Sequence, residues 1–163
     1  MPTGPTGRPA RVVIGVGNPH RRDDRCGLDV LRTLAGRVPP DVALFEAPAD
    51  ATALLDLWAD RELAIVVDAV RSDRPAGTLH RWALGEGALP TELGGTSTHG
   101  LGIAEAVGLG RSLDRLPRRL TVLGIEAADL GVGEGLTPSV ARAVVGAAHA
   151  VLRELASRPG REA

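Results

Sequence analysis

The feature that most constrains this chain is an apolar run that leads into a glycine-rich turn and then into two adjacent carboxylates. Residues 12–16 are apolar, and Gly15 and Gly17 allow the backbone to turn sharply after them. Asp23 and Asp24 follow shortly afterwards. This order predicts a strand that leads into a helix, and open α/β sheets bind their ligands at that edge. The two carboxylates are able to bind a metal, to transfer protons, or to cap the helix by accepting its free N–H groups.

A dinucleotide-binding turn of an oxidoreductase is the obvious alternative for such a sequence. That turn has the pattern Gly-x-Gly-x-x-Gly, and the third glycine is replaced here by His20. The two acids after the turn would repel a pyrophosphate, and Glu46 comes somewhat late for the acidic residue that binds the ribose. These residues therefore disfavour a nucleotide-binding oxidoreductase.

The composition fits one domain with an aliphatic core. Of the 163 residues, 44% are hydrophobic but only 2% are aromatic, so the core must be built from Val, Leu, Ile and Ala. We expect one domain over residues 11–157, a disordered tail at residues 1–10 and a second tail at 158–163. A net charge of −1 gives no general attraction to nucleic acid or to an anionic membrane. No apolar run is long enough to span a bilayer and no signal peptide is recognisable, which predicts a cytoplasmic protein.

Two residue types exclude whole classes of chemistry. Every basic side chain except histidine is an arginine, which excludes a Schiff-base lysine and a P-loop lysine. Cys26 is the single cysteine, so an internal disulfide and a cysteine-rich metal site are excluded. Cys26 itself has two interpretations: a nucleophile with a pKa lowered by the arginines and the helix start nearby, or a small buried residue that faces the sheet.

Short apolar runs alternate with helical patterns along the chain, which is typical of a layered α/β domain. We expect strands at residues 11–16, 41–46, 63–68, 77–82 and 120–125. Helices are expected after Asp24, after a capping Asp50, after Thr98, and after Thr137, which we expect to cap a helix with Pro138 in its first turn. The link 71–77 is too short for a crossover helix, so the fourth strand must run antiparallel. The sequence thus predicts a three-layer αβα sandwich around a mixed, mostly parallel, twisted five-stranded sheet.

Two further residues are candidates for a functional site. Asp68 ends an apolar run that is typical of a central strand, and it is either a site carboxylate or a turn and capping residue. His99 follows a run of small residues at the expected start of a helix, where it is either a ligand or a packing residue. His20 is close enough to the glycine-rich turn to be a spare ligand, whereas His80 and His149 are expected to be structural or exposed.

Asp24, Asp68 and His99 come from three separate loops that should meet at one edge of the sheet. Two carboxylates and one imidazole suit a borderline divalent ion such as Ni²⁺ or Zn²⁺, with positions left open for water or for a substrate group. These residue types do not choose between the metals.

The chain resembles the hydrogenase maturation endopeptidases from Val12 to about Leu155. Four ordered motifs carry the resemblance: the glycine-rich turn with Gly15, Gly17, Asn18, Asp23, Asp24 and Gly27; Asp68 to Thr78; the segment around His99; and Leu120 to Glu126 followed by Gly135 to Val140. One segment departs from the pattern. Many members have Asp-Gly-Gly-Thr after the second strand, where this chain has Glu46-Ala-Pro-Ala49, and that segment is linked with recognition of the partner. The resemblance therefore does not imply which hydrogenase is processed.

The resemblance implies a function and roles for individual residues. Asp24, Asp68 and His99 are expected to bind a metal in a cleft and to recognise the nickel already inserted into the precursor of a NiFe-hydrogenase large subunit. The enzyme would then remove the short C-terminal extension of that subunit, with Glu46 and Asn18 as substrate-binding residues. The family leads us to expect a monomer.

Two catalytic routes and one other function stay open. A carboxylate could activate water as an aspartic-type base, or a divalent metal could polarise the scissile carbonyl or supply hydroxide. The chain lacks the His-Glu-x-x-His motif, and no Ser, His and Asp set stands out. The alternative function is a nickel or hydrogenase chaperone that has the same site but does not cut.

Overall fold

A single mixed sheet organises the structure, a computed structural model that describes residues 7–84 and 100–157. The strand order across the sheet is β2 (Val42–Ala47), β1 (Arg11–Val16), β3 (Leu63–Val70), β5 (Arg119–Glu126) and β4 (Leu79–Ala83). The first four strands run parallel, and β4 runs antiparallel to β5. The mixed, mostly parallel five-stranded sheet is therefore confirmed.

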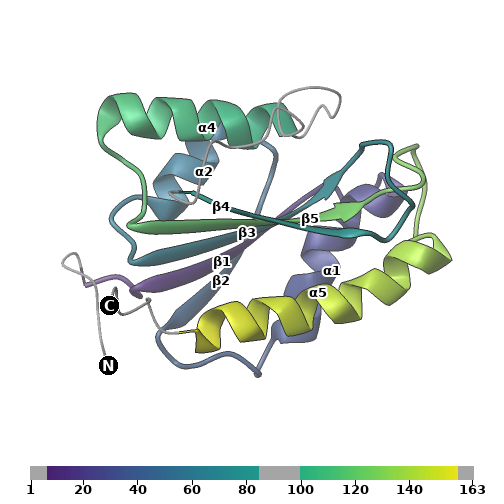
Figure 1. Cartoon of the computed structure of the whole chain (residues 1–163), viewed down its shortest axis with the longest axis horizontal. Helices are drawn as coiled ribbons and strands as arrows, with labels where there is room; N and C mark the ends of the chain where they lie inside the picture. The colour runs from purple at the N-terminus through teal and green to yellow at the C-terminus, as the bar shows by residue number, and fades with distance from the viewer. Residues whose placement is uncertain (1–6, 85–99, 158–163) are drawn as a thin grey trace.

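Helices cover both faces of this sheet and produce three layers (Figure 1). The helices α1 (Cys26–Leu34) and α5 (Pro138–Ala156) lie on one face, and α2 (Ala51–Trp58) and α4 (Gly100–Leu113) lie on the other. The predicted αβα sandwich is thus the observed architecture. No helix in the described part of the chain combines the length and the hydrophobicity that crossing a membrane requires.

The alternation of side chains along the central strands separates the core into two parts. All eight residues of β3 are buried, as expected for a parallel strand with helices on both faces. Val13 packs with α1 and α5, whereas Val12 and Ile14 pack with α2 and α4. Trp58 is fully buried, and most other core residues are aliphatic. The aliphatic core that the composition predicts is therefore present on both faces.

The ends of the helices confirm one capping prediction and correct another. Asp50 caps α2, because its carboxylate accepts a hydrogen bond of 2.9 Å from the Ala53 N–H. Thr137 precedes Pro138 at the start of α5, but its hydroxyl makes no capping bond. Thr137 is therefore the N-cap residue of α5 with Pro138 in the first turn, as predicted, but its hydroxyl donates to the carboxylate of Asp23 and does not cap the helix.

The expected tails fall mostly outside the described residues, which begin at Gly7 and end at Ser157. The last residues of the expected N-terminal tail belong to the folded domain. Ala10 is buried, and its carbonyl accepts a hydrogen bond of 2.8 Å from the Glu62 N–H. The carbonyl of Pro9 accepts from the guanidinium of Arg61.

Candidate functional site

Backbone packing places the candidate carboxylates together at the carboxyl edge of the parallel strands. A short 3₁₀ helix, η1 (Arg22–Arg25), carries Asp24 and leads directly into α1. At Gly27 in the first turn of α1, a Cβ atom would overlap with the carbonyl oxygens of Val16 and Val67. Only glycine allows the start of α1 to pack this closely on the ends of β1 and β3. The sequence Asp-Asp-Arg-Cys-Gly therefore fixes Asp24 beside the strand that carries Asp68.

The glycine-rich turn holds the carboxylate of Asp24 directly. The Asn18 N–H donates to Asp24 Oδ2 over 3.1 Å, and Asp24 is fully buried. A Cβ atom at Gly17 would overlap with the Asp24 carbonyl oxygen, so the turn and η1 form one closely packed unit. The Asn18 side chain accepts from the His20 N–H over 2.9 Å, which closes a local Asx turn. The predicted substrate-binding role of Asn18 stays a prediction.

Asp68 is a buried acid that lacks the partners such a group normally has. Its exposed fraction is 1%, and neither of its carboxylate oxygens has a hydrogen-bond partner within residues 7–84 and 100–157. Burial raises the pKa of Asp68 well above its usual range, and the negative charge of Asp24 raises it further. The Ala69 N–H has a smaller, opposing effect on this pKa. A proton or an external cation would therefore stabilise Asp68 in this position.

The donor chemistry of this pair fits a divalent cation. Two neighbouring buried carboxylates repel each other unless a positive charge lies between them. His99, the third predicted ligand, lies outside the described residues, and α4 begins at the next residue, Gly100. A Cβ atom at Gly102 would lie 3.2 Å from Ala49 in the loop after β2, which places the first turn of α4 at the same edge of the sheet. Among the residues described, no three metal-binding side chains are grouped together.

The acid before Asp24 has a different, structural environment. The carboxylate of Asp23 is fully buried and accepts from the N–H groups of Ala128, Asp129 and Thr137 over 2.7–2.9 Å. It caps neither η1 nor α1, so the capping interpretation is wrong for Asp23. Asp23 joins the loop before α5 to the segment that carries Asp24.

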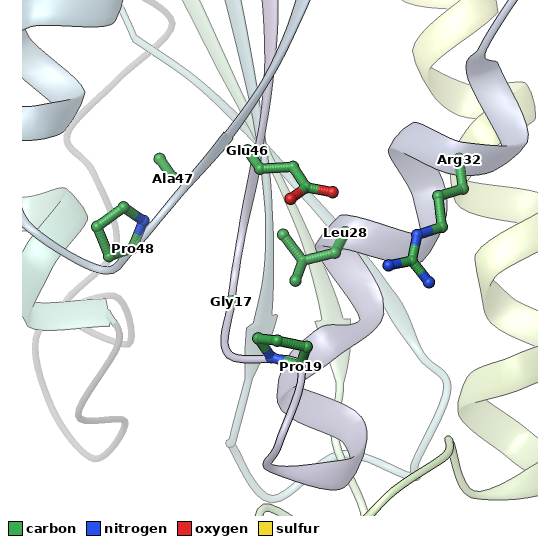
Figure 2. Close-up of a pocket in the computed structure, with 7 residues that line it drawn as sticks. All are labelled: Gly17, Pro19, Leu28, Arg32, Glu46, Ala47 and Pro48. Atoms are coloured by element: carbon green, nitrogen blue, oxygen red, sulfur yellow. The ribbon is translucent and has the colours of Figure 1, made fainter.

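A shallow pocket opens beside the glycine-rich turn (Figure 2). It has a volume of about 260 Å³. The residues that line it are Gly17, Pro19, Leu28, Arg32, Glu46, Ala47 and Pro48. Figure 2 shows Glu46 on β2 and Arg32 on α1 on opposite walls, with Leu28 between them. The predicted substrate-binding residue Glu46 therefore lines an open pocket, although no substrate tests its role.

Cys26 is a buried structural residue and not an exposed nucleophile, the other interpretation that the sequence left open. Its side chain lies in the core under α1, and burial followed by the charge of Asp68 raises the pKa of the thiol well above its usual range. A thiol with a raised pKa forms little thiolate, which is the nucleophilic form.

A second buried acid near Asp68 was missed by the sequence reasoning. Glu126 at the end of β5 is 1% exposed, and it accepts from the Ser72 N–H over 2.6 Å and from the Ser72 hydroxyl over 2.5 Å. His80 Nε2 lies 3.1 Å from the same carboxylate and stacks on Trp82. His80 therefore has a structural role, because it contacts the buried Glu126 carboxylate and stacks on Trp82. Buried polar residues at strand ends are the signal that could have suggested this cluster.

A model of the hydrogenase maturation protease family matches residues 29–154, which is most of the chain. The chain belongs to this family. The hydrogenase 2 maturation protease of Escherichia coli strain K12 is 30% identical to this maturation protease over 148 residues, which cover 88% of this chain and 89% of the relative. The hydrogenase expression/formation protein HupD of Thiocapsa roseopersicina is 26% identical over 153 residues, covering 91% of this chain and 68% of that protein.

Solved structures have the same fold as this maturation protease. The hydrogenase maturating endopeptidase HybD from E. coli superimposes with a TM-score of 0.80 at 28% identity, over 90% of this chain and 91% of that one. A NiFe-hydrogenase maturation protease HybD from Thermococcus kodakarensis gives a TM-score of 0.71 at 24% identity, over 90% and 99% of the two chains. The second likeness concerns the fold alone.

Proposed function

We propose that this maturation protease removes the C-terminal extension from the precursor of a NiFe-hydrogenase large subunit after nickel has been inserted. Membership of a maturation protease family supports the peptidase activity and the class of substrate. The observation that carries the assignment of the site is Asp68, a buried carboxylate next to Asp24 with no hydrogen-bond partner in the described part of the chain.

In this proposal the nickel is part of the substrate and is the feature that the enzyme recognises. Asp24, Asp68 and His99 would contact the nickel of the precursor. The repulsion between Asp24 and Asp68 supports this role, because an incoming cation lowers the cost of holding both charges in a buried place. A precursor without nickel would lack that interaction and would bind more weakly.

We further propose that Asp68 is the base that activates water. Burial raises the pKa of Asp68, so a carboxylate oxygen that the nickel does not contact would accept the proton of a water molecule more readily than an ordinary aspartate would. A resident divalent ion such as zinc, held by Asp24, Asp68 and His99, would instead polarise the scissile carbonyl. Protease treated with a chelator and desalted before mixing separates the two routes, because only the first predicts full cleavage.

The function is tested with the immature, nickel-loaded large subunit from the same organism and intact-mass measurement. We expect the wild type to shorten the subunit at its C-terminus, and Asp68→Asn to leave it intact. The matched control is Asp56→Asn, the same change at an exposed aspartate on α2, which should cleave like the wild type. Binding without cleavage by the wild type would favour the non-cleaving chaperone, and a nickel-free precursor cut at the same rate would refute nickel recognition. The monomeric state and the cytoplasmic location stay predictions.

A further inference from the structure

The outer edge of β2 carries backbone groups that the sheet does not use. β2 is the first strand in the sheet order and has β1 on one side only. The Arg11 N–H donates to the carbonyl of Asp41, and the Gly17 N–H donates to the carbonyl of Ala47. The backbone N–H and C=O groups of the odd-numbered residues in this strand therefore point toward β1. Because these groups alternate in direction along a parallel strand, those of Leu44 and Glu46 point outward, away from the sheet. Within the described residues no backbone partner meets these two residues.

The pocket described above adjoins this edge at the end nearest to the carboxylate pair. Glu46 contributes its side chain to the pocket as well as its outward backbone groups to the edge. Its carboxylate is exposed, and no hydrogen bond or ion pair holds it in the part of the chain that the structure describes. Gly17 forms another wall, and the next residue, Asn18, donates its N–H to Asp24. A chain that follows the edge of β2 toward its carboxyl end therefore reaches the glycine-rich turn that holds the buried Asp24.

We propose that the C-terminal segment of the precursor binds as an added strand along the outer edge of β2. This inference rests on the proposed function and names how its substrate is held. An extended peptide would exchange main-chain hydrogen bonds with Leu44 and Glu46, the mode by which many domains bind peptides at a sheet edge. The peptide residue opposite Glu46 would have its side chain on the same face and therefore in the pocket. The free carboxylate of Glu46 selects a hydrogen-bond donor there, such as a basic side chain.

Proline substitution tests the added strand with a matched control on the other edge of the sheet. Leu44→Pro removes an outward N–H that β1 does not use, and edge strands tolerate proline at such positions. On β4, the Glu126 N–H donates to Thr78 and the Leu84 N–H donates to Leu120. The N–H of Leu79 therefore also points away from the sheet, and Leu79→Pro is the same change at the opposite edge. We expect kcat/KM for the nickel-loaded precursor to fall about tenfold with Leu44→Pro and to change little with Leu79→Pro.

Amide hydrogen exchange gives a readout that needs no variant to fold. In wild-type protein, the amides of Leu44 and Glu46 should exchange quickly, and the precursor should slow both by about tenfold or more. Ala43 and Phe45, whose amides face β1, should be protected already and should change little.

The pocket is tested with Glu46→Lys, which should raise KM about tenfold with little change in kcat. The control is Glu105→Lys, the same change at an exposed position on α4, which should leave KM unchanged.

The outcomes separate this inference from the function on which it rests. A wild type that does not cleave the precursor would overturn the proposed function. A wild type that cleaves while Leu44→Pro cleaves equally fast, with unchanged exchange at Leu44 and Glu46, would overturn only the added strand. A wild-type dimer that becomes a monomer in Leu44→Pro would also overturn it, because a second copy of the chain would then occupy the edge.

Discussion

Thr137 donates both its backbone N–H and its hydroxyl to the carboxylate of Asp23, at 2.7 Å and 2.9–3.0 Å. Two further N–H groups of the same loop donate to this carboxylate. The loop before α5 is therefore fixed to the segment that holds Asp24, although these residues lie far apart in the chain. Asp23 has a structural role, whereas the negative charge of the adjacent Asp24 acts on Asp68 and raises its pKa.

Asp23→Asn should destabilise the protein strongly. An amide keeps the size of the side chain but loses the charge and one acceptor, so donors of the loop are left buried and unpaired. Hydrogen bonds to charged groups contribute more than neutral ones, and we expect a loss of about 2–4 kcal/mol in the free energy of unfolding by urea. Asp73→Asn, at an exposed position with no contact of this kind, should change the stability by less than about 0.5 kcal/mol. Equal stability of the two variants would contradict the structural role of Asp23.

Asp68→Asn should stabilise the metal-free protein near neutral pH, and the gain should depend on pH. The pKa of Asp68 is raised in the folded state, so the folded protein binds its proton more tightly than the unfolded chain does. The contribution of Asp68 to the free energy of unfolding of the wild type is therefore largest below the ordinary aspartate pKa of about 3.9, and it is lost as the pH rises toward the raised pKa of the folded state. Asparagine cannot ionise and avoids that loss.

Urea midpoints at several pH values, measured in the presence of a chelator, check this prediction. The advantage of Asp68→Asn over the wild type should be largest at high pH and should shrink as the pH approaches about 4. An advantage that is independent of pH would mean that Asp68 ionisation does not oppose folding. The same variant should be inactive, which would make Asp68 a case in which function and stability conflict.

Gly27→Ala should disrupt the junction between α1 and the sheet. The added Cβ would overlap with the carbonyls of Val16 and Val67, which are backbone atoms and cannot rotate away. We expect a destabilisation of more than about 3 kcal/mol, together with loss of cleavage because Asp24 shifts. The control is Gly108→Ala in α4, where the new methyl group meets no atom within 4 Å. That change should stabilise the helix by up to about 1 kcal/mol, as thermal unfolding would show.

His80→Phe should separate the two contacts of His80. Phenylalanine keeps a ring that stacks on Trp82 but removes the contact with Glu126, whose carboxylate then has only Ser72 as a partner among the described residues. We expect a loss of about 1–2 kcal/mol in urea unfolding. Ser72→Ala, which removes the hydroxyl donor, should cost a similar amount. The loss of unfolding free energy in the double variant should differ from the sum of the two single losses, because His80 and Ser72 share one acceptor. Strictly additive losses would argue against a shared cluster.

Much of the fold was predictable because it depends on local patterns. Apolar runs placed the five strands within two residues of their observed starts, and the link after β3 was too short for anything but an antiparallel β4. Asp24 was recognisable because it follows an apolar strand at the edge where α/β sheets bind ligands. Asp68 was recognisable because it interrupts an apolar run, although β3 continues for two residues beyond it, to Val70. The proposed third ligand, His99, remains a prediction, because it lies outside the described residues.

The sequence by itself determined the order of strands and helices along the chain and the carboxylates near the ends of β1 and β3, because periodicity and turn chemistry act between near neighbours. Tertiary structure alone decided which acids are free to do chemistry. Asp23 and Thr137 are 114 positions apart, and Ser72 and Glu126 are 54 apart. No local pattern reveals that these acids have partners and that Asp68 has none in the described chain. The pairing of a buried charge depends on what the fold brings to it, and that decides whether the charge stabilises the protein or is available to a substrate.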